Sequence, residues 1–452
     1  MGTITLGQAA QWCGGQVAPK YENVTFLGAN NDSRKVEKGQ LFVALQGVRD
    51  GHDFIPAALE NGAAAVLCTH CDGDYPAIIV SDTRLALGDI ARHERMRLNM
   101  QVVCITGSVG KSTTKEMVAS VLASTYRVAK TPVNHNNDIG MPMAILAMPE
   151  DTQVAVLELG MNHFREIAYL SEIAKPDVAV IINIGTMHIE HLGSMEGILQ
   201  AKLEILEGMR EGGEVILNGD DPLLWNLHKT LEKCSYFGVN NTESAILCKD
   251  LEENTGLIRM RVRCKNREFP VELALEGSHY VPDALAAVSV GLAFDVTPEK
   301  ICQSLSAFEN MAGRQEIFRA GEFTIIKDCY NAGPESMAAA LNVLGNRSGR
   351  RVAVLGDMLE LGVCTQAEHY KVGRIAAEKA DLLFAYGSNS DRLVSGAITG
   401  GMSDTCATAF DDKEKLVKAL KQMARPGDVI LFKGSRGMRL ELVLERFLAE
   451  EK

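Results

Sequence analysis

Residues 104–115 read Cys-Ile-Thr-Gly-Ser-Val-Gly-Lys-Ser-Thr-Thr-Lys, a glycine-rich turn between an apolar run and a segment with the pattern of a helix. A strand, such a turn and a helix together aim backbone N–H groups and the positive end of the helix dipole at one point, which suits an anion. Lys111 adds a charge that can reach terminal phosphates, and the Ser112 hydroxyl can bind Mg²⁺. Strict phosphate-loop spacing would require glycine at position 105, where the chain has Ile105. The stretch therefore predicts a shortened phosphate-binding loop.

Apolar runs flank this loop and predict the sheet that carries it. They end in glycine or a polar residue, as is typical of parallel strands covered on both faces, and they lie at 101–106, 154–160, 177–185 and 214–219. The segment after the loop has a helical stripe formed by Met117, Val118, Val121 and Leu122. Strands that alternate with helices in this way predict a doubly wound α/β sheet.

The length of 452 residues suggests about three domains. Residues 1–98 carry short strand-like runs at 41–45, 64–67 and 77–80, which predict a small α/β domain. Residues 99–312 form the predicted nucleotide-binding domain. Residues 313–452 begin a second α/β series, Rossmann-like, with strands expected at 323–328, 351–357, 381–387 and 428–434. Because ligands of open α/β sheets bind at the carboxyl ends of the strands, we expect the active site between the last two domains.

The composition indicates a cytoplasmic protein that binds neither nucleic acid nor membranes. The 58 acidic and 46 basic residues give a net charge of -12, which disfavours polyanionic partners. The chain has no apolar run long enough to span a bilayer, and its first residues lack the pattern of a signal peptide. The 11 cysteines indicate reduced thiols. Cys68 and Cys71 have the spacing of a metal site, but a closed zinc site needs four ligands, so a strand end and a turn are favoured.

Polar residues after the predicted strands are candidates for the site. Glu158 ends a strand beside the phosphate loop, where a carboxylate suits Mg²⁺. His188 follows the next strand and is left open between a structural histidine and a ligand. The run at 134–138 supplies amides that can bind a polar substrate or merely form a turn. Lys202, taken alone, is interpreted as a solvated lysine on an amphipathic helix.

Ten segments together resemble the Mur ligases of peptidoglycan synthesis, in order and over nearly the whole chain. They are DSRKVEKGQLFVALQGVRDGHDFI (32–55), TGSVGKSTTKEM (106–117), NHNNDIGMP (134–142), LELGMNHFREI (157–167), NIGTMHIEHLGS (183–194), AKLEIL (201–206), GRQEIF (313–318), DCYNAGPESM (328–337), LGDMLELG (355–362) and FKGSR (432–436). The segment at 328–337 differs from the sequence that sister ligases adding a single amino acid carry there.

The resemblance implies an ATP-dependent carboxylate–amine ligase that acts as a monomer. Its substrates would be UDP-N-acetylmuramoyl-tripeptide, held by the N-terminal domain, and D-alanyl-D-alanine. ATP would phosphorylate the terminal carboxylate, and the amine of the dipeptide would attack the acyl phosphate to release phosphate. Two alternatives stay open: a sister ligase that adds one amino acid, and a P-loop NTPase whose hydrolysis drives a conformational switch.

The resemblance also assigns residues. The residues that would bind the ATP phosphates are Gly107, Ser108, Val109, Gly110, Lys111, Ser112 and Thr113. His279 would lie near adenine, Arg314 near phosphate and Asp328 near ribose. Ser112 and Glu158 would hold one Mg²⁺. A second Mg²⁺ would be held by His188 and by Lys202 carbamylated by CO₂. The catalytic residues would be Lys111, Glu158, His188 and Lys202. Substrate residues would be Ser33, Arg34, Asn134, Asn137, Asp138, Tyr330, Asn331, Lys433, Ser435 and Arg436.

The chain departs from the family pattern in two segments. In GSHYVPDALAA (277–287), Tyr280 and Asp283 replace two asparagines, which affects the expected adenine contacts. In DCYNAGPESM, Cys329 stands where serine is common and Gly333 where asparagine is usual. The predicted phosphate and metal positions are intact, so we expect the chemistry to be retained.

Overall fold

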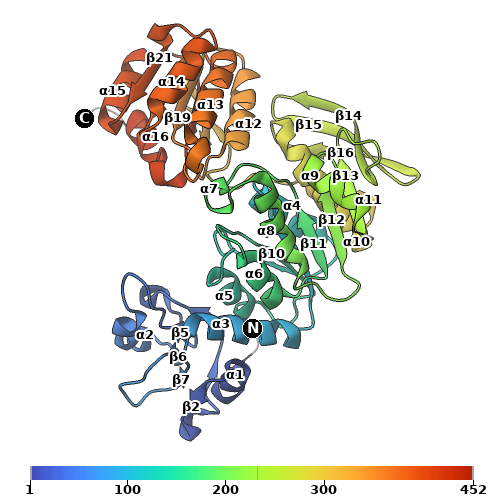
Figure 1. Cartoon of the computed structure of the whole chain (residues 1–452), viewed down its shortest axis with the longest axis vertical. Coiled ribbons are helices and arrows are strands. Elements are labelled where there is room, and N and C mark those ends of the chain that lie inside the picture. The colour runs from blue at the N-terminus through green and yellow to red at the C-terminus, as the bar shows by residue number, and fades with distance from the viewer. Residues whose placement is uncertain (1–2, 232, 450–452) are drawn as a thin grey trace.

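The computed structural model describes residues 3–231 and 233–449. Three α/β bodies follow one another along an elongated molecule, the N-terminal body at one end and the C-terminal body at the other (Figure 1). Their sheets have five, nine and six strands, beside a separate two-stranded sheet. Within the described ranges, no helix combines the length and the apolar character needed to span a membrane.

The N-terminal body is a small α/β unit. Its sheet has the order β2 (Gln16–Val17), β7 (Ala77–Ile79), β6 (Ala65–Cys68), β5 (Leu41–Val43) and β4 (Ala29–Asn30), and only β2 pairs antiparallel. Strands β1 (Ile4–Thr5) and β3 (Thr25–Phe26) form the separate pair, and the helices are α1 (Leu6–Cys13), α2 (Ile55–Glu60) and α3 (Thr83–Arg97). The three predicted strands are confirmed as β5, β6 and β7.

The central sheet contains the four strands predicted around the phosphate loop. Its order is β16 (Arg267–Leu273), β15 (Leu257–Cys264), β14 (Ile246–Asn254), β13 (Cys234–Gly238), β12 (Glu214–Asn218), β11 (Val178–Ile181), β8 (Gln101–Thr106), β10 (Val154–Glu158) and β9 (Val128–Lys130). Strands β8 to β14 are parallel, as expected of the apolar runs. The antiparallel extension through β15 and β16 was not predicted.

Helices cover both faces of the central sheet, which confirms the doubly wound arrangement. Alternate residues of β8 enter two different cores: Val102 and Cys104 pack with one set of helices, Val103 and Ile105 with the other. The first core includes residues of α3, α5 (Gly140–Leu146), α6 (Glu166–Ala174) and α8 (Met195–Leu203). The second includes α4 (Lys111–Ala123), α10 (Val281–Ala293) and α11 (Pro298–Ser306), and the predicted stripe of α4 is fully buried in it. Two short helices, α7 (Ile189–Leu192) and α9 (Pro222–Trp225), lie in the loops.

The C-terminal body is a six-stranded sheet with helices on both faces. The order is β17 (Glu316–Ala320), β18 (Phe323–Asp328), β22 (Val429–Lys433), β19 (Arg351–Gly356), β20 (Leu382–Tyr386) and β21 (Ala407–Phe410), parallel except for the β17–β18 hairpin. One core includes α12 (Pro334–Gly345), α13 (Thr365–Lys379) and α14 (Ser390–Thr399), and the other α15 (Lys413–Met423) and α16 (Glu441–Leu448). The four predicted strands are confirmed as β18, β19, β20 and β22, whereas the exact domain limits stay predictions.

Candidate active site

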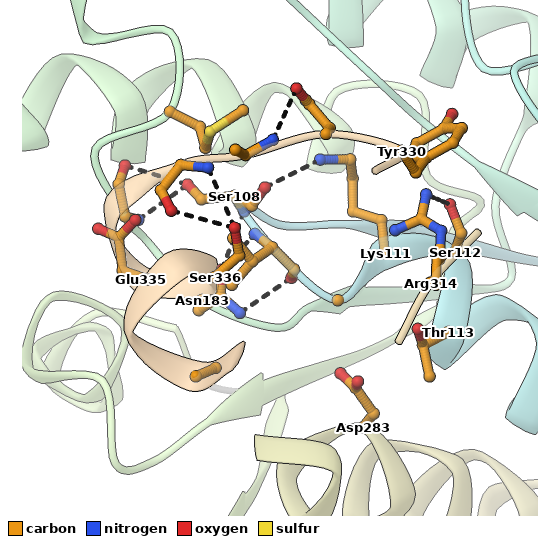
Figure 2. A pocket seen from close by; sticks show the side chains of 18 of the residues that line it. Ser108, Lys111, Ser112, Thr113, Asn183, Asp283, Arg314, Tyr330, Glu335 and Ser336 are labelled. Atoms are coloured by element: carbon orange, nitrogen blue, oxygen red, sulfur yellow. Dashed lines mark hydrogen bonds between the residues drawn. The ribbon is translucent and has the colours of Figure 1, made fainter. Parts of the chain in front are cut away.

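A pocket of about 640 Å³ lies where the central and C-terminal bodies meet. The central body contributes the loop before α4, Glu158 at the end of β10, the segment after β11 and the start of α10. The C-terminal body contributes residues around the end of β18, the first turns of α12 and Lys433 at the end of β22. Figure 2 shows that side chains from both bodies point into the same space.

The phosphate loop is held in shape by Asn183, which was not predicted as a site residue. The side-chain oxygen of Asn183 accepts from the N–H groups of Ser108 and Val109, both at 2.9 Å, and its amide donates to the Val109 carbonyl at 3.0 Å. These bonds use two of the N–H groups that a bound anion could have taken. The loop turns at Gly110 with φ 84°, in the left-handed region that favours glycine, and α4 begins at once. The N–H groups of the first turn of α4 remain available to an anion.

Lys111 is folded back onto its own loop. Its Nζ donates to the carbonyl of Gly107 at 2.8 Å and to that of Ser108 at 3.2 Å. Burial lowers the pKa of Lys111, and the nearby carboxylate of Glu158 opposes this shift. Carbonyl oxygens are weaker partners for an ammonium than phosphate oxygens, so a bound phosphate can attract this side chain away from the loop.

Glu158 and Ser112 form one hydrogen-bonded unit with Arg314 of the other body. The Ser112 hydroxyl donates to Oε2 of Glu158 at 2.7 Å. It accepts from Nη2 of Arg314 at 2.9 Å (Figure 2). Oε1 of Glu158 accepts from Asn136 at 2.9 Å, and the Arg314 guanidinium lies 4.1 Å from the ring centre of Tyr330. Ser112 and Glu158 are both buried. Arg314 therefore brings a positive charge from the chain's C-terminal part directly to the phosphate loop.

The oxygen donors at this point fit Mg²⁺ completed by a nucleotide. A hydroxyl and a carboxylate are hard ligands, and Mg²⁺ is commonly held by one or two protein groups together with substrate phosphates. No three His, Cys, Asp or Glu side chains gather closely enough to hold a metal by themselves in residues 3–231 and 233–449. The His188 ring lines the pocket, and its Nδ1 lies 2.7 Å from Oε2 of Glu360 in the C-terminal body. His188 also lowers the pKa of Glu360.

Lys202 is buried, which corrects its interpretation as a solvated lysine. It lies on α8 with only 2% of its surface exposed. Burial, and then the charge of Lys111, hold the pKa of Lys202 well below its ordinary value. The amphipathic pattern failed here because α8 is covered on the side that carries this residue. A buried lysine of this kind favours the neutral amine.

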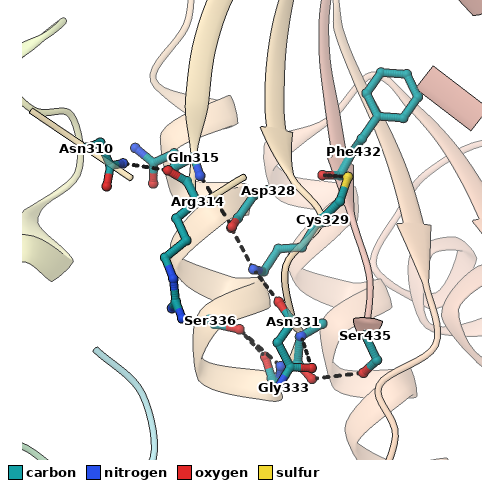
Figure 3. Close-up of polar contacts among 12 residues, drawn as sticks. Asn310, Arg314, Gln315, Asp328, Cys329, Asn331, Gly333, Ser336, Phe432 and Ser435 are labelled. Atoms are coloured by element: carbon teal, nitrogen blue, oxygen red, sulfur yellow. Dashed lines mark hydrogen bonds and ion pairs between the residues drawn. The ribbon is translucent and has the colours of Figure 1, made fainter. Parts of the chain in front are cut away.

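Asp328 and Lys433 form an ion pair at the ends of two neighbouring strands. Nζ of Lys433 donates to Oδ2 of Asp328 at 2.6 Å and to the Asn331 carbonyl at 3.1 Å. Oδ1 of Asp328 accepts from the Gln315 N–H at 3.3 Å (Figure 3). Asp328, Lys433 and Asn331 line the pocket, as does Tyr330, whose hydroxyl contacts Asn134 of the central body.

Ser435 and Arg436 do not line the pocket. The Ser435 hydroxyl donates to the Ala332 carbonyl at 3.2 Å and accepts from the Leu359 N–H at 2.9 Å, so it ties two loops together. The exposed Arg436 pairs with Glu441 at 3.3 Å. Within the described part of the chain, six further predicted residues lie outside the lining: Ser33, Arg34, Gly107, Asn134, Asp138 and Lys202.

The N-terminal candidates and the amide cluster serve local structure in this conformation. The Arg34 side chain pairs with Asp32 at 2.9 Å, and the Ser33 carbonyl accepts from Asn61 at 2.9 Å. Asp138 pairs with Arg84 at 2.9 Å. Asn137 lines the pocket, although its side-chain oxygen accepts from the Gly140 N–H at 2.8 Å at the start of α5.

Two of the residues that depart from the family pattern, Tyr280 and Asp283, line the pocket at the start of α10. The Asp283 carboxylate accepts from the Thr114 hydroxyl at 2.8 Å, and burial raises the pKa of Asp283 to about 7. The Tyr280 hydroxyl accepts from Asn310 at 2.7 Å. His279 also lines the pocket, where burial lowers its pKa to about 4 and so keeps the ring neutral at physiological pH.

Two further contacts join the bodies and were not predicted. The Glu335 carboxylate, in the first turn of α12, accepts from the Thr186 N–H at 2.9 Å and from its hydroxyl at 3.1 Å. A side chain at Gly333 would overlap the Met187 thioether, since an added Cβ would lie 2.2 Å from its sulfur. Single polar residues in loops carry no periodic pattern, but Glu335 directly follows a proline at a helix start, where acidic residues are favoured.

Comparisons with known proteins agree with this arrangement along the whole chain. Three family models match: the Mur ligase family catalytic domain at residues 23–95, the Mur ligase middle domain at 105–291 and the Mur ligase glutamate ligase domain at 313–436. A UDP-N-acetylmuramoyl-tripeptide–D-alanyl-D-alanine ligase from Bacillus subtilis (strain 168) is 40% identical over 98% of this chain and 97% of its own.

Solved structures give the same result for the fold. The MurF crystal structure from Acinetobacter baumannii superposes with a TM-score of 0.92 at 31% identity and covers 100% of both chains. The MurF ligase from Thermotoga maritima in complex with ADP has a TM-score of 0.82 at 30% identity, covering 93% of this chain and 97% of that one.

Proposed function

This chain belongs to the Mur ligase family, and from that premise we propose that it joins D-alanyl-D-alanine to UDP-N-acetylmuramoyl-tripeptide with conversion of ATP to ADP and phosphate. The observation that carries the proposal is the pocket between the two bodies. It sets the first turn of α4 and Lys111 opposite Arg314, Asp328 and Lys433, so that a nucleotide and a second polar substrate can meet there. The names of the relatives that match along the full length supply the substrates.

The chemistry follows from the weakness of a carboxylate as an electrophile. An oxygen of the tripeptide's terminal carboxylate attacks the γ-phosphorus of ATP, and ADP leaves. The amine of D-alanyl-D-alanine then attacks the acyl carbon, phosphate leaves with the electron pair of the broken C–O bond, and the amine loses a proton. Both steps need positioning and charge neutralisation more than covalent catalysis by the protein.

The chain's own groups supply that neutralisation. The free N–H groups of the first turn of α4 bind the phosphates, and Lys111 moves from the carbonyls of Gly107 and Ser108 to the γ-phosphoryl group. Arg314 adds a second positive charge at Ser112. Ser112 and Glu158 would hold one Mg²⁺ and His188 a second; bound Mg²⁺ neutralises charge on the phosphate oxygens.

We assign Lys202 as the carbamylated residue of this site. Its burial and its depressed pKa favour the neutral amine, which is the form that adds CO₂ to give a carbamate and a proton. The carbamate is an anion with oxygen donors of the kind that Mg²⁺ prefers, and it would place a negative charge near Lys111. Carbamylation therefore converts a buried amine, which the charge of Lys111 disfavours as a cation, into an anion that this charge favours.

The remaining assignments follow from position. Asp328 and His279 would contact the nucleotide, and Tyr330, Asn331 and Lys433 the acyl phosphate or the dipeptide, because all five line the pocket. Ser33 and Arg34 would serve the UDP group in the N-terminal body, and Asn134, Asn137 and Asp138 the peptide between the bodies. Ser435 and Arg436 would contact the dipeptide only after their loop moves. One chain contains the whole pocket, so we propose a monomer, acting in the cytoplasm.

Acceptor selection tests this function. The purified chain is incubated with ATP, Mg²⁺, UDP-N-acetylmuramoyl-tripeptide and D-alanyl-D-alanine, and the product is identified by mass spectrometry. The proposal predicts a UDP-linked pentapeptide, formed only with all components and lost in Lys111→Met. Ligation of a single amino acid to the UDP-linked dipeptide would identify a sister ligase, and steady ATP turnover without an acceptor would identify a nucleotide switch.

A further inference from the structure

Glu360 approaches the proposed metal ligand His188 from the other body. It lies in the C-terminal body between β19 and a short 3₁₀ turn, η7 (Gly362–Cys364), and its Oε2 is 2.7 Å from Nδ1 of His188. His188 immediately precedes α7 of the central body. Figure 1 shows α7 at the junction of the two bodies, beside the C-terminal sheet. The contact therefore exists only while the two bodies are together.

The surrounding backbone holds this approach in place. An added Cβ at Gly362 would lie 3.0 Å from the Cβ of Glu190 on α7, so the loop that carries Glu360 packs closely on that helix. His188 and Glu360 both have left-handed backbones, with φ of 65° and 64°. This conformation is uncommon for residues other than glycine and is kept only where the surroundings impose it.

Nδ1 of the His188 imidazole lacks a hydrogen-bond partner within the described residues. Nδ1 of His188 is buried and has no well-aligned hydrogen bond, although the Glu360 carboxylate is within reach. The His188 side chain is 16% exposed and that of Glu360 46%. A small turn of the ring or of the exposed carboxylate is enough to align Nδ1–H with Oε2, because their separation is already that of a hydrogen bond.

We infer that Glu360 is a positioning residue for His188: its carboxylate accepts a hydrogen bond from Nδ1–H and thereby leaves the lone pair of Nε2 for a divalent cation. This inference rests on the proposed function, which makes His188 a metal ligand. A histidine that binds a metal through one nitrogen commonly donates its other N–H to a carboxylate, which fixes tautomer and ring orientation. Because Glu360 and His188 belong to different bodies, this histidine is fully oriented for metal binding only when the bodies are in contact.

Binding of Mn²⁺ to the full chain with ADP tests the inference. Electron paramagnetic resonance measures free Mn²⁺ for the wild type, Glu360→Ala, Glu360→Gln and His188→Ala. We expect Glu360→Ala to weaken Mn²⁺ binding by about 10- to 100-fold, as is typical when a partner of a metal-bound histidine is removed. Glu360→Gln should lose less than Glu360→Ala, because the amide oxygen still accepts from Nδ1–H. Glu190→Gln, which removes a charge from the same contact region without touching the imidazole, should bind Mn²⁺ as the wild type does.

The outcomes distinguish a failure of the role of Glu360 from a failure of the proposed function, in which His188 is a metal ligand. If His188→Ala weakens Mn²⁺ binding and Glu360→Ala does not, Glu360 does not position the ligand. If Gln and Ala at position 360 cause the same loss, Glu360 binds the metal directly and the positioning role is wrong. If His188→Ala has no effect, the metal assignment within the proposed function is wrong. Nitrogen chemical shifts of labelled histidine give a second test without mutation: we expect His188 as the Nδ1–H tautomer, and an Nε2–H tautomer would overturn the inference.

Discussion

Replacement of Asp283 by asparagine should stabilise the central body, and increasingly so as the pH rises. Asp283 is 4% exposed, its carboxylate accepts from the Thr114 hydroxyl, and its Oδ1 lies 2.5 Å from the position that a Cβ at Gly110 would occupy. Burial raises the pKa of this carboxyl to about 7, while Thr114 and Arg314 oppose the shift. The carboxyl is thus buried beside the phosphate loop with a hydroxyl as its hydrogen-bond donor.

The direction of the effect follows from proton binding. The folded chain keeps a proton on Asp283 up to about pH 7, whereas the unfolded chain loses it near 3.8. Stability therefore falls as the pH rises through this interval, because the folded state binds the proton more tightly. At about 1.4 kcal/mol for each pKa unit, the loss is about 4 kcal/mol in all, of which about 2 to 3 kcal/mol falls between about pH 5 and pH 8.

Urea unfolding at several pH values measures the effect. Asparagine still accepts from the Thr114 hydroxyl but does not titrate, so the stability difference between D283N and the wild type should grow by about 2 to 3 kcal/mol from about pH 5 to pH 8. Trp225 reports on the central body, and a Trp12→Phe background removes the other tryptophan of the chain. Thr114→Val serves as the control, because it removes the hydrogen bond and leaves the carboxyl. Parallel pH profiles for D283N and the wild type would refute the reasoning.

Three further predictions concern activity and shape. Lys202→Ala should lose most ligase activity and be rescued in part by a short carboxylic acid, as measured by phosphate release; full activity would eliminate the carbamate. Asn183→Ala should weaken ATP binding by about 1 to 3 kcal/mol in calorimetry, because the N–H groups of Ser108 and Val109 lose their shared acceptor; unchanged affinity would show that Asn183 does not shape the loop. Small-angle scattering should show a more compact chain with ATP and both substrates, since an acyl phosphate must be shielded from water; one unchanged shape would contradict closure.

Much of the fold could be predicted because buried parallel strands leave a strong pattern. The strands β8, β10, β11 and β12 are apolar at their central positions, since alternate residues enter two different cores. The segment 257–273 alternates buried and exposed residues instead, because one face of β15 and β16 meets solvent. Such alternation is itself a strand pattern, but the predicted sheet rested on continuous apolar runs, so its antiparallel extension was missed.

Site residues could be predicted where several polar residues share a short segment. They were harder to predict where a single side chain bonds to a residue that is distant in the sequence. The phosphate loop was predicted because its glycines, Lys111 and Ser112 lie in one short stretch of sequence. Asn183 and Glu335 act on residues distant in sequence. Asn183 has no pattern of its own, and the helix-start position of Glu335 does not indicate its partner Thr186. Lys202 was misinterpreted from its helix, since periodicity cannot reveal what covers a helix face.

The fate of a carboxylate oxygen tests the central claim most directly. UDP-N-acetylmuramoyl-tripeptide is labelled with ¹⁸O in its terminal carboxylate and incubated with the chain, ATP, Mg²⁺ and D-alanyl-D-alanine, and the released phosphate is analysed by mass spectrometry. An acyl-phosphate ligase transfers one ¹⁸O to each phosphate as the amide forms. Phosphate that carries no ¹⁸O, released at the same rate without the dipeptide, would contradict the account.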